Sequence, residues 1–308
     1  MIRTLKHLFV PNPLDDILSD AVDRGLRKIL IVWNRGLGDI ALGLFPLTHR
    51  IREYLPQAEI TFLTRPDLEE GFLLLHDIAV ISSPTIKRGK SFSVEEELRK
   101  TGHSPADFDL IMEKPDPTRW LYPQIGKLTP KLTWRSEWDT LHKKFVDTSS
   151  GISIGVHVQT ETNYNYEKNW PVDHWRRFFA EAKKLDARIF LFGFSPQPVF
   201  EGENIVDLRG KTNLLEMLSI IKSCCTHLVV PDSGVLCLAY YLDIVMPLHI
   251  VSLWADPRQG ILRQKVASPN PALMHMPFVG RNKDTSRIPV EEVLQALKSK
   301  GTCKLKKF

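Results

Sequence analysis

The sequence contains three short motifs whose residue types could bind a phosphate group or move a proton. The first is Gly36-Leu37-Gly38-Asp39, which follows the apolar run 28–33. Glycines let a backbone turn tightly and approach a ligand, and Asp39 could accept a proton or a hydrogen bond from a hydroxyl group. An aspartate before a helix is also a good N-cap, so the sequence leaves both interpretations of Asp39 open.

The second motif is Asp232-Ser233-Gly234, which again lies between an apolar run and an expected helix. Ligands of open α/β sheets bind beyond the carboxyl ends of the strands. The backbone N–H groups of Ser233 and Gly234 could therefore hold a diphosphate at the helix N-terminus. The alternative is a capped turn, in which these groups serve only the helix.

The third motif centres on Lys168, three residues before Pro171 at an expected helix start. A lysine there could neutralise a phosphate as a point charge, although a solvated surface lysine would have the same sequence pattern. We expect His157 and His227 to be core or edge residues rather than ligands. The sequence contains no metal-binding motif and no nucleophile elbow, so it predicts no metal site and no cofactor.

The elements that must position these motifs alternate between strand and helix in both halves of the chain. The pattern predicts strands over 28–33, 59–64, 152–158 and 188–193, and two more in HLVVPD and LHIVSLW. It predicts helices over 40–54 and 235–242, one that begins after Pro171, and one that begins at the capping box of Asn213 and Glu216. This alternation predicts an α/β fold with two Rossmann-like, doubly wound domains. Residues 113–150 are rich in proline, tryptophan and charge, which is typical of loops and a linker. We therefore expect a first domain over 1–145 and a second over 146–308.

Composition excludes several classes of protein. The 308 residues are 43% hydrophobic and carry a formal net charge of +5, which suits two buried cores and does not indicate a nucleic-acid binder. No apolar run reaches the roughly 18 residues of a membrane span, and the four cysteines form no C-x-x-C pair, so we expect a soluble cytoplasmic protein. The lysine-rich tail could touch the anionic inner face of the cytoplasmic membrane, but a solvated end is the favoured interpretation.

Five segments, taken in order, resemble one enzyme family. Residues 28–65 resemble the opening of glycosyltransferase family nine, the ADP-heptose:lipopolysaccharide heptosyltransferases. IGVHVQT, KNWP, DLRGKTNLLEMLSIIKSC and LVVPDSGVLCLA resemble later landmarks of that family. The similarity covers about 28–65 and 152–257 and leaves the middle and both tails uncovered.

The resemblance implies a GT-B fold, with two Rossmann-like domains facing a central cleft, and sugar transfer that inverts the anomeric carbon without a metal ion. It implies that Asp39 is the general base and that Gly36 and Gly38 contact the acceptor. The first domain would bind the acceptor and the second the nucleotide-sugar donor. The expected donor-binding residues are Thr160, Thr162, Lys168, Lys211, Thr212, Asp232, Ser233 and Gly234.

The sequence departs from the family pattern at two places. Cys237 stands where the family usually has histidine, and a thiol does not donate so strong a hydrogen bond or carry positive charge. Residues 253–257 read Leu-Trp-Ala-Asp-Pro, where the family has Phe-Gly-Pro-Thr-x-Pro. We expect a transferase that moves heptose from ADP-heptose to a lipopolysaccharide core or another surface glycan. The alternatives are another nucleotide-sugar donor, or a non-catalytic member that serves as a binding or scaffold protein. The sequence does not identify the acceptor or the oligomeric state.

Overall fold

The computed structural model describes residues 12–121, 124–147, 151–161 and 166–298. The chain divides into two compact units, Met1–Leu132 and Thr133–Phe308. The division differs from the expected boundary near 145 because residues 133–145 are bound to the second unit. The His142 backbone N–H donates to Ser219 Oγ over 3.1 Å, and Lys144 Nζ lies 2.7 Å from Glu216 Oε1.

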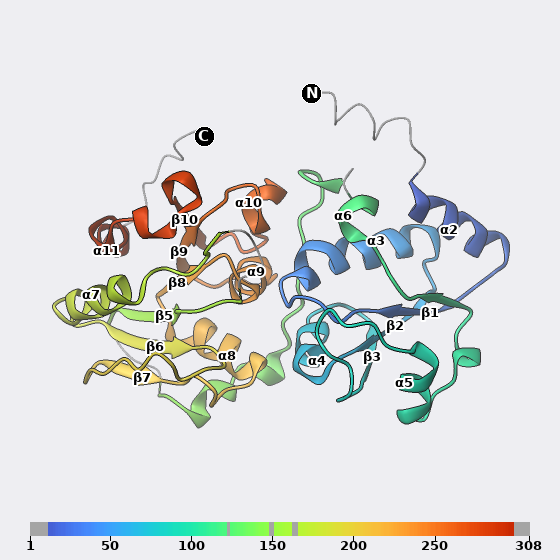
Figure 1. Cartoon of the computed structure of the whole chain (residues 1–308), viewed down its shortest axis with the longest axis horizontal. Helices are drawn as coiled ribbons and strands as arrows, with labels where there is room; N and C mark the ends of the chain where they lie inside the picture. The colour runs from blue at the N-terminus through green and yellow to red at the C-terminus, as the bar shows by residue number, and fades with distance from the viewer. Residues whose placement is uncertain (1–11, 122–123, 148–150, 162–165, 299–308) are drawn as a thin grey trace. The chain divides into compact units, whose positions relative to one another are not determined.

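The first unit contains a four-stranded parallel sheet in the order β3-β2-β1-β4. In Figure 1, α2, α3 and α6 lie on one side of this sheet and α4 and α5 on the other. Its elements are α2 (Pro13–Asp23), β1 (Lys28–Val32), α3 (Phe45–Tyr54), β2 (Glu59–Thr64), α4 (Pro66–Phe72), β3 (Ile78–Ser82), α5 (Val94–Lys100), β4 (Leu110–Met112) and α6 (Pro117–Trp120). The predicted strands 28–33 and 59–64 are confirmed as β1 and β2.

The predicted helix over 40–54 is confirmed with one irregularity. It opens as a π-helix over Ile40–Leu44 and continues as α3. Pro46 lacks an N–H group and its ring crowds the preceding turn, so a regular α-helix cannot run through this point. A Cβ built on Gly43 would lie 2.9 Å from Pro117 Cβ, so the small residue lets α6 approach the π turn closely.

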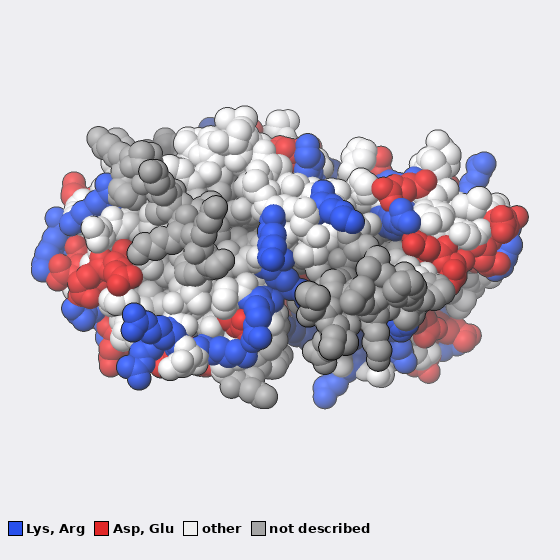
Figure 2. Space-filling view, turned by 90° about the horizontal axis from the view of Figure 1, so that it is seen from above, with Lys and Arg blue, Asp and Glu red and all other residues white. Residues whose placement is uncertain are grey.

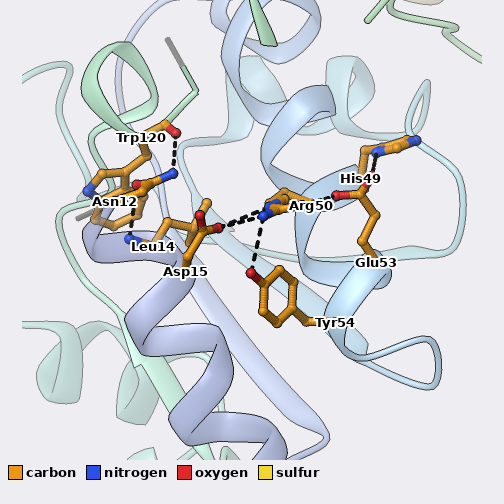
Figure 3. Close-up of polar contacts among 8 residues, drawn as sticks. All are labelled: Asn12, Leu14, Asp15, His49, Arg50, Glu53, Tyr54 and Trp120. Atoms are coloured by element: carbon orange, nitrogen blue, oxygen red, sulfur yellow. Dashed lines mark hydrogen bonds and ion pairs between the residues drawn. The ribbon is translucent and has the colours of Figure 1, made fainter. Parts of the chain in front are cut away.

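Helix α2 was not among the predicted elements. Figure 3 shows the polar contacts that attach it to α3 and to Trp120. Its N-cap is Asn12, whose side chain accepts the Leu14 N–H and donates to the Trp120 carbonyl over 2.8 Å. Arg50 of α3 donates from Nε and Nη2 to Asp15 Oδ1 over 3.0 and 2.9 Å. Helix α2 is thereby tied to α3, the helix that follows the Asp39 motif.

The second unit contains a six-stranded parallel sheet in the order β10-β9-β8-β5-β6-β7, seen from top to bottom in Figure 1. Its elements are β5 (Ser153–His157), α7 (Val172–Lys183), β6 (Arg188–Phe192), β7 (Ile205–Asp207), α8 (Leu214–Cys224), β8 (His227–Pro231), α9 (Gly234–Tyr241), β9 (Leu248–Trp254), α10 (Gly260–Gln264), β10 (Leu273–Val279) and α11 (Val290–Lys298). The predicted strands and helices of this half are confirmed.

The local signals of the second unit act as the sequence indicates. Asn213 Oδ1 accepts the Glu216 N–H over 2.8 Å, and Glu216 Oε2 accepts the Asn213 N–H over 3.0 Å. This capping box opens α8. The buried aromatics Trp170, Trp175 and Phe178 pack in one cluster with apolar residues of β5, β6 and α11. The core therefore lies between the sheet and the helices that the periodicity predicts.

The surface carries charges of both signs. On the face in Figure 2, lysine and arginine side chains are interspersed with aspartate and glutamate on each unit. Within the parts of the chain that the structure describes, no helix combines the length and the apolar character that crossing a membrane would require.

Candidate active site

Asp39 lies directly after the loop that leaves the carboxyl end of β1. Its Oδ2 accepts the Gly36 N–H over 2.9 Å, and its backbone is already helical, with φ −65° and ψ −22°. The side chain makes no capping hydrogen bond to the helix that follows. The carboxylate therefore closes the loop 36–39, and the alternative interpretation as an N-cap is wrong. A cap needs an extended backbone that turns the side chain toward the first turn of the helix, and Asp39 does not have one.

Positive charge lies next to this carboxylate. A Cβ built on Gly36 would lie 3.1 Å from Asp39 Oδ2 and 3.9 Å from Arg88 Nη2, so both groups line the same small space. Arg65, at the end of β2, has a side chain that is only 14% exposed, and it donates to the Arg35 carbonyl over 3.1 Å. Burial, with the nearby Arg88 charge adding to it, lowers the pKa of Arg65. Arg65 also pairs with Asp67 Oδ2 over 3.1 Å, so Arg88 is the cation that would favour an anionic group beside Asp39.

The sequence analysis did not find Arg65 and Arg88. Neither belongs to a motif, because Arg65 follows β2 and Arg88 lies in the loop after β3. The available signal was topological: the ends of neighbouring parallel strands meet at one edge of a sheet, so basic residues just after β2 and β3 come close to the end of β1.

In the second unit the structure brings together two of the expected donor-binding residues. Lys168 Nζ lies 2.5 Å from Asp232 Oδ2, and the two side chains are 10% and 9% exposed. A Cβ built on Gly260 would lie 2.5 Å from Asp232 Oδ1, and the φ of Gly260 is +49°. Position 260 is therefore restricted to glycine by the close approach of this ion pair.

Ser233 caps the helix that begins beside this ion pair. Its Oγ accepts the Leu236 N–H over 3.3 Å, so the capped-turn interpretation is confirmed for its side chain. Gly234 is the first residue of α9, which places its backbone at the positive end of the helix dipole. Cys237 is 2% exposed on the buried side of α9.

Two hydrogen bonds join the Thr160 backbone to the side chain of Asn169, the residue after Lys168. Its N–H donates to Asn169 Oδ1 over 2.7 Å, and Asn169 Nδ2 donates back to the Thr160 carbonyl over 3.0 Å. Thr162 lies outside the described residues. Asn169 thus links Thr160, which follows β5, to the segment that carries Lys168.

Lys211 and Thr212 lie apart from this group, although they are at the same edge of the sheet. They follow β7, which is three strands from β8, and neighbouring strands are about 4.8 Å apart. Lys211 Nζ donates to the Asp207 carbonyl over 2.7 Å. The expected donor residues therefore line one edge of the sheet as an elongated series, which would suit a ligand of several linked groups.

The two histidines behave as structural residues. His157, at the end of β5, is 7% exposed, and burial lowers its pKa to about 4. Burial also lowers the pKa of His227 to about 4, with the neighbouring His249 adding to the effect. Both rings are neutral at pH 7. Among the described residues, no group of three or more His, Cys, Asp or Glu side chains could hold a metal ion.

Residues 124–246 match the sequence model of glycosyltransferase family 9 (heptosyltransferase). No curated protein sequence matches the chain significantly.

Several solved structures share its fold. The ADP-heptose LPS heptosyltransferase II of E. coli is 16% identical, with 88% of this chain and 97% of that chain covered and a TM-score of 0.61. A glycosyl transferase family 9 protein of Veillonella parvula is 15% identical, with 88% and 96% covered and a TM-score of 0.59. The predicted fold class, α/β of GT-B type with two Rossmann-like sheets, is confirmed.

Proposed function

We propose that the chain is a glycosyltransferase of family 9, whose sequence model matches residues 124–246, and that it transfers a sugar from a nucleotide-sugar to a hydroxyl group of an anionic glycan. The proposed donor is ADP-heptose and the proposed acceptor a lipopolysaccharide core or similar surface glycan. The first unit, with Asp39, binds the acceptor, and the second, with Lys168 and Asp232, binds the donor. The reaction takes place at the cytoplasmic face of the inner membrane.

In the proposed reaction Asp39 removes the proton of the acceptor hydroxyl as its oxygen attacks the anomeric carbon of the donor. The bond from that carbon to the phosphate oxygen breaks on the opposite side, so configuration is inverted, and the electron pair stays on the nucleoside diphosphate. Lys168 and the backbone N–H groups at the start of α9 offset this charge. No metal ion takes part.

The observation that carries this proposal is the orientation of the Asp39 carboxylate. Its carboxylate is oriented by the Gly36 N–H and is not used to cap the helix. Arg88 lies beside it and would attract an anionic acceptor. A carboxylate that is positioned without serving the helix is suited to general-base catalysis.

The test measures donor consumption and ligand binding separately. The donors are ADP-heptose and other ADP-, UDP- and GDP-sugars, and a lipopolysaccharide-core preparation is the acceptor. Asp39→Asn should lower turnover at least a hundredfold, in line with the usual contribution of a general base. The control is Asp20→Asn, which removes a carboxylate that is 64% exposed on α2 and should leave turnover unchanged.

Binding is followed by thermal unfolding with each donor and its free nucleoside diphosphate. A ligand at about a hundred times its Kd should add about 2.7 kcal/mol to the free energy of unfolding. Stabilisation by a different nucleotide would mean that the donor is another nucleotide-sugar and would leave the proposed reaction unchanged. Donor binding with no turnover that depends on Asp39 would refute the catalytic proposal and favour a non-catalytic family member.

A further inference from the structure

A second buried carboxylate lies on the strand next to Asp232. Asp256 follows β9, and β9 is paired with β8, where the Asp232 N–H donates to the Leu253 carbonyl over 3.1 Å. The Asp256 side chain is 4% exposed. It accepts three hydrogen bonds from Arg258, from the backbone N–H over 3.0 Å, Nε over 2.9 Å and Nη2 over 2.7 Å. Lys283 Nζ lies 3.2 Å from its Oδ2.

We name these three residues, Asp256, Arg258 and Lys283, the Asp256 clamp. The hydrogen bonds from Arg258 hold the pKa of Asp256 well below its usual range, although burial opposes them. Asp256 is thus an anion at any physiological pH, and it orients two cations. One carboxylate compensates only one of them, so the clamp carries a net positive charge.

The backbone that presents Lys283 is strained. Asn282 and Lys283 are consecutive non-glycine residues in the left-handed region, with φ of 57° and 59°. Such conformations cost about 1–3 kcal/mol each and cluster at ligand sites. A Cβ built on Gly280 would lie only 2.0 Å from the Asp284 carbonyl oxygen, so the turn also requires glycine there. The fold sustains this strain where it brings Lys283 to Asp256.

The clamp is continuous with the Lys168–Asp232 pair. Lys283 Nζ lies 4.9 Å from the ring centroid of Tyr166, two residues before Lys168. A Cβ built on Gly260, two residues after Arg258, would meet the Asp232 carboxylate, so the backbone at Gly260 runs close to Asp232. Lys168 is only 10% exposed, whereas Lys283 and Arg258 are 46% and 72% exposed. The two clamp cations are therefore accessible to a ligand that reaches the ion pair.

The order of the strands fixes which part of the ligand would meet the clamp. Along the carboxyl edge, Lys211 follows β7, Asp232 follows β8, and the clamp follows β9 and β10. A nucleotide-sugar with its base near Lys211 and its diphosphate at the start of α9 would extend its sugar-side phosphate toward β9. This is also the phosphate that gains charge when the sugar leaves.

We infer that the Asp256 clamp binds the sugar-side phosphate of the donor, and that Arg258 and Lys283 are further catalytic residues that stabilise the departing nucleoside diphosphate. This inference rests on the proposed function. Arg258 and Lys283 contact the phosphate, and Asp256 is a positioning residue that acts through them. When the bond from the anomeric carbon to the phosphate oxygen breaks, its electron pair stays on that oxygen and the two cations offset the added charge.

The test uses the full chain and three probes: inorganic pyrophosphate, ADP and AMP. The variants are Arg258→Gln, Lys283→Gln and the double substitution, and binding is measured by calorimetry. A hydrogen bond to a charged group corresponds to about tenfold in affinity, so each single variant should bind pyrophosphate and ADP about tenfold more weakly. AMP lacks the sugar-side phosphate, so its affinity should change less than threefold.

The matched control is Arg287→Gln, which removes a 70% exposed arginine that pairs with Asp284 and should leave all three affinities unchanged. Asp256→Asn should weaken pyrophosphate binding, and it should lower kcat more than it raises KM for the donor. If Asp256 had only a structural role, Asp256→Asn would change thermal stability without lowering kcat more than it raises KM. Circular dichroism and thermal unfolding of every variant establish that it is folded.

Three results would overturn the inference: no pyrophosphate binding by the unsubstituted protein, binding within twofold in the double variant, or equal losses for AMP and ADP. Failure of the proposed function has a different signature. In that case the clamp variants would lose pyrophosphate as expected, and no sugar would be transferred in an Asp39-dependent way.

Discussion

Buried neutral histidines should make the second unit sensitive to mild acid. Burial lowers the pKa of His157 and of His275 from 6.5 to about 4. As pH falls below 6.5 the unfolded chain takes up a proton at each position and the folded chain does not, so stability is present above pH 6.5 and is lost toward pH 4. At pH 5 this loss is about 2 kcal/mol for each histidine, since one pKa unit corresponds to about 1.4 kcal/mol.

His157 and His275 together should therefore lower the free energy of unfolding by about 4 kcal/mol between pH 7.5 and pH 5, and His227, whose pKa is also lowered to about 4, adds to this loss. In this interval carboxylates stay ionised in the unfolded chain, so they contribute little. Urea unfolding followed by tryptophan fluorescence at several pH values measures the effect. His157→Leu should reduce the slope of stability against pH by about 1.2 kcal/mol per pH unit near pH 5.

His76→Gln is the control, because that side chain is 73% exposed and should not affect the slope. A slope that stays the same in His157→Leu would refute the reasoning, since the ring would then titrate alike in the folded and unfolded chains.

Three further predictions concern close packing and buried charge. Gly260→Ala should abolish nucleotide binding and lower the melting temperature, because its Cβ would meet the Asp232 carboxylate; Gly89→Ala, with a similar φ and nothing within 4 Å, should cost only about 1 kcal/mol. Lys168→Met should lower the free energy of unfolding by about 3–5 kcal/mol, because it leaves Asp232 charged and buried. In urea unfolding, a smaller loss of stability in the Lys168→Met/Asp232→Asn double variant would confirm that the two side chains are energetically coupled. Glu97 is 4% exposed, and its pKa is lowered to about 2 although burial opposes the shift. It should stabilise the first unit above pH 4.5 and lose that contribution as the pH falls toward 2. Glu97→Gln should remove this pH dependence in acid titrations.

The sequence predicts the local parts of this fold well because their causes are local. A buried strand such as β1 is a continuous apolar run, and the capping box of Asn213 and Glu216 depends on residues three apart. The resemblance to the family also named Lys168 and Asp232. The sequence could not show that these two residues pair, because they are 64 positions apart and meet only after the β5 and β8 strands are placed side by side.

Other features have causes that no single segment carries. Whether Asp39 caps its helix depends on the backbone angles of one residue, which the residue type does not determine. Residues 133–145 look like a linker by composition, yet hydrogen bonds to α8 attach them to the second unit. Of the clamp residues, only Asp256 lies in the segment 253–257 where the sequence departs from the family pattern, and the strained turn that supplies Lys283 has no sequence signature of its own.

The π turn at Ile40–Leu44 makes the position of Asp39 sensitive to insertion and deletion. A π turn holds one residue more than the α-helical path, so removing one residue there would shorten the turn to that path, while Pro46 would still lack its N–H donor as it does now. Each helical residue turns the chain by about 100°, so the same deletion would rotate Asp39 away from its loop relative to α3. We expect length changes in this segment to be tolerated for stability and not for activity. The spacing between Asp39 and Pro46 is therefore a better marker of a working enzyme than the identity of the residues between them.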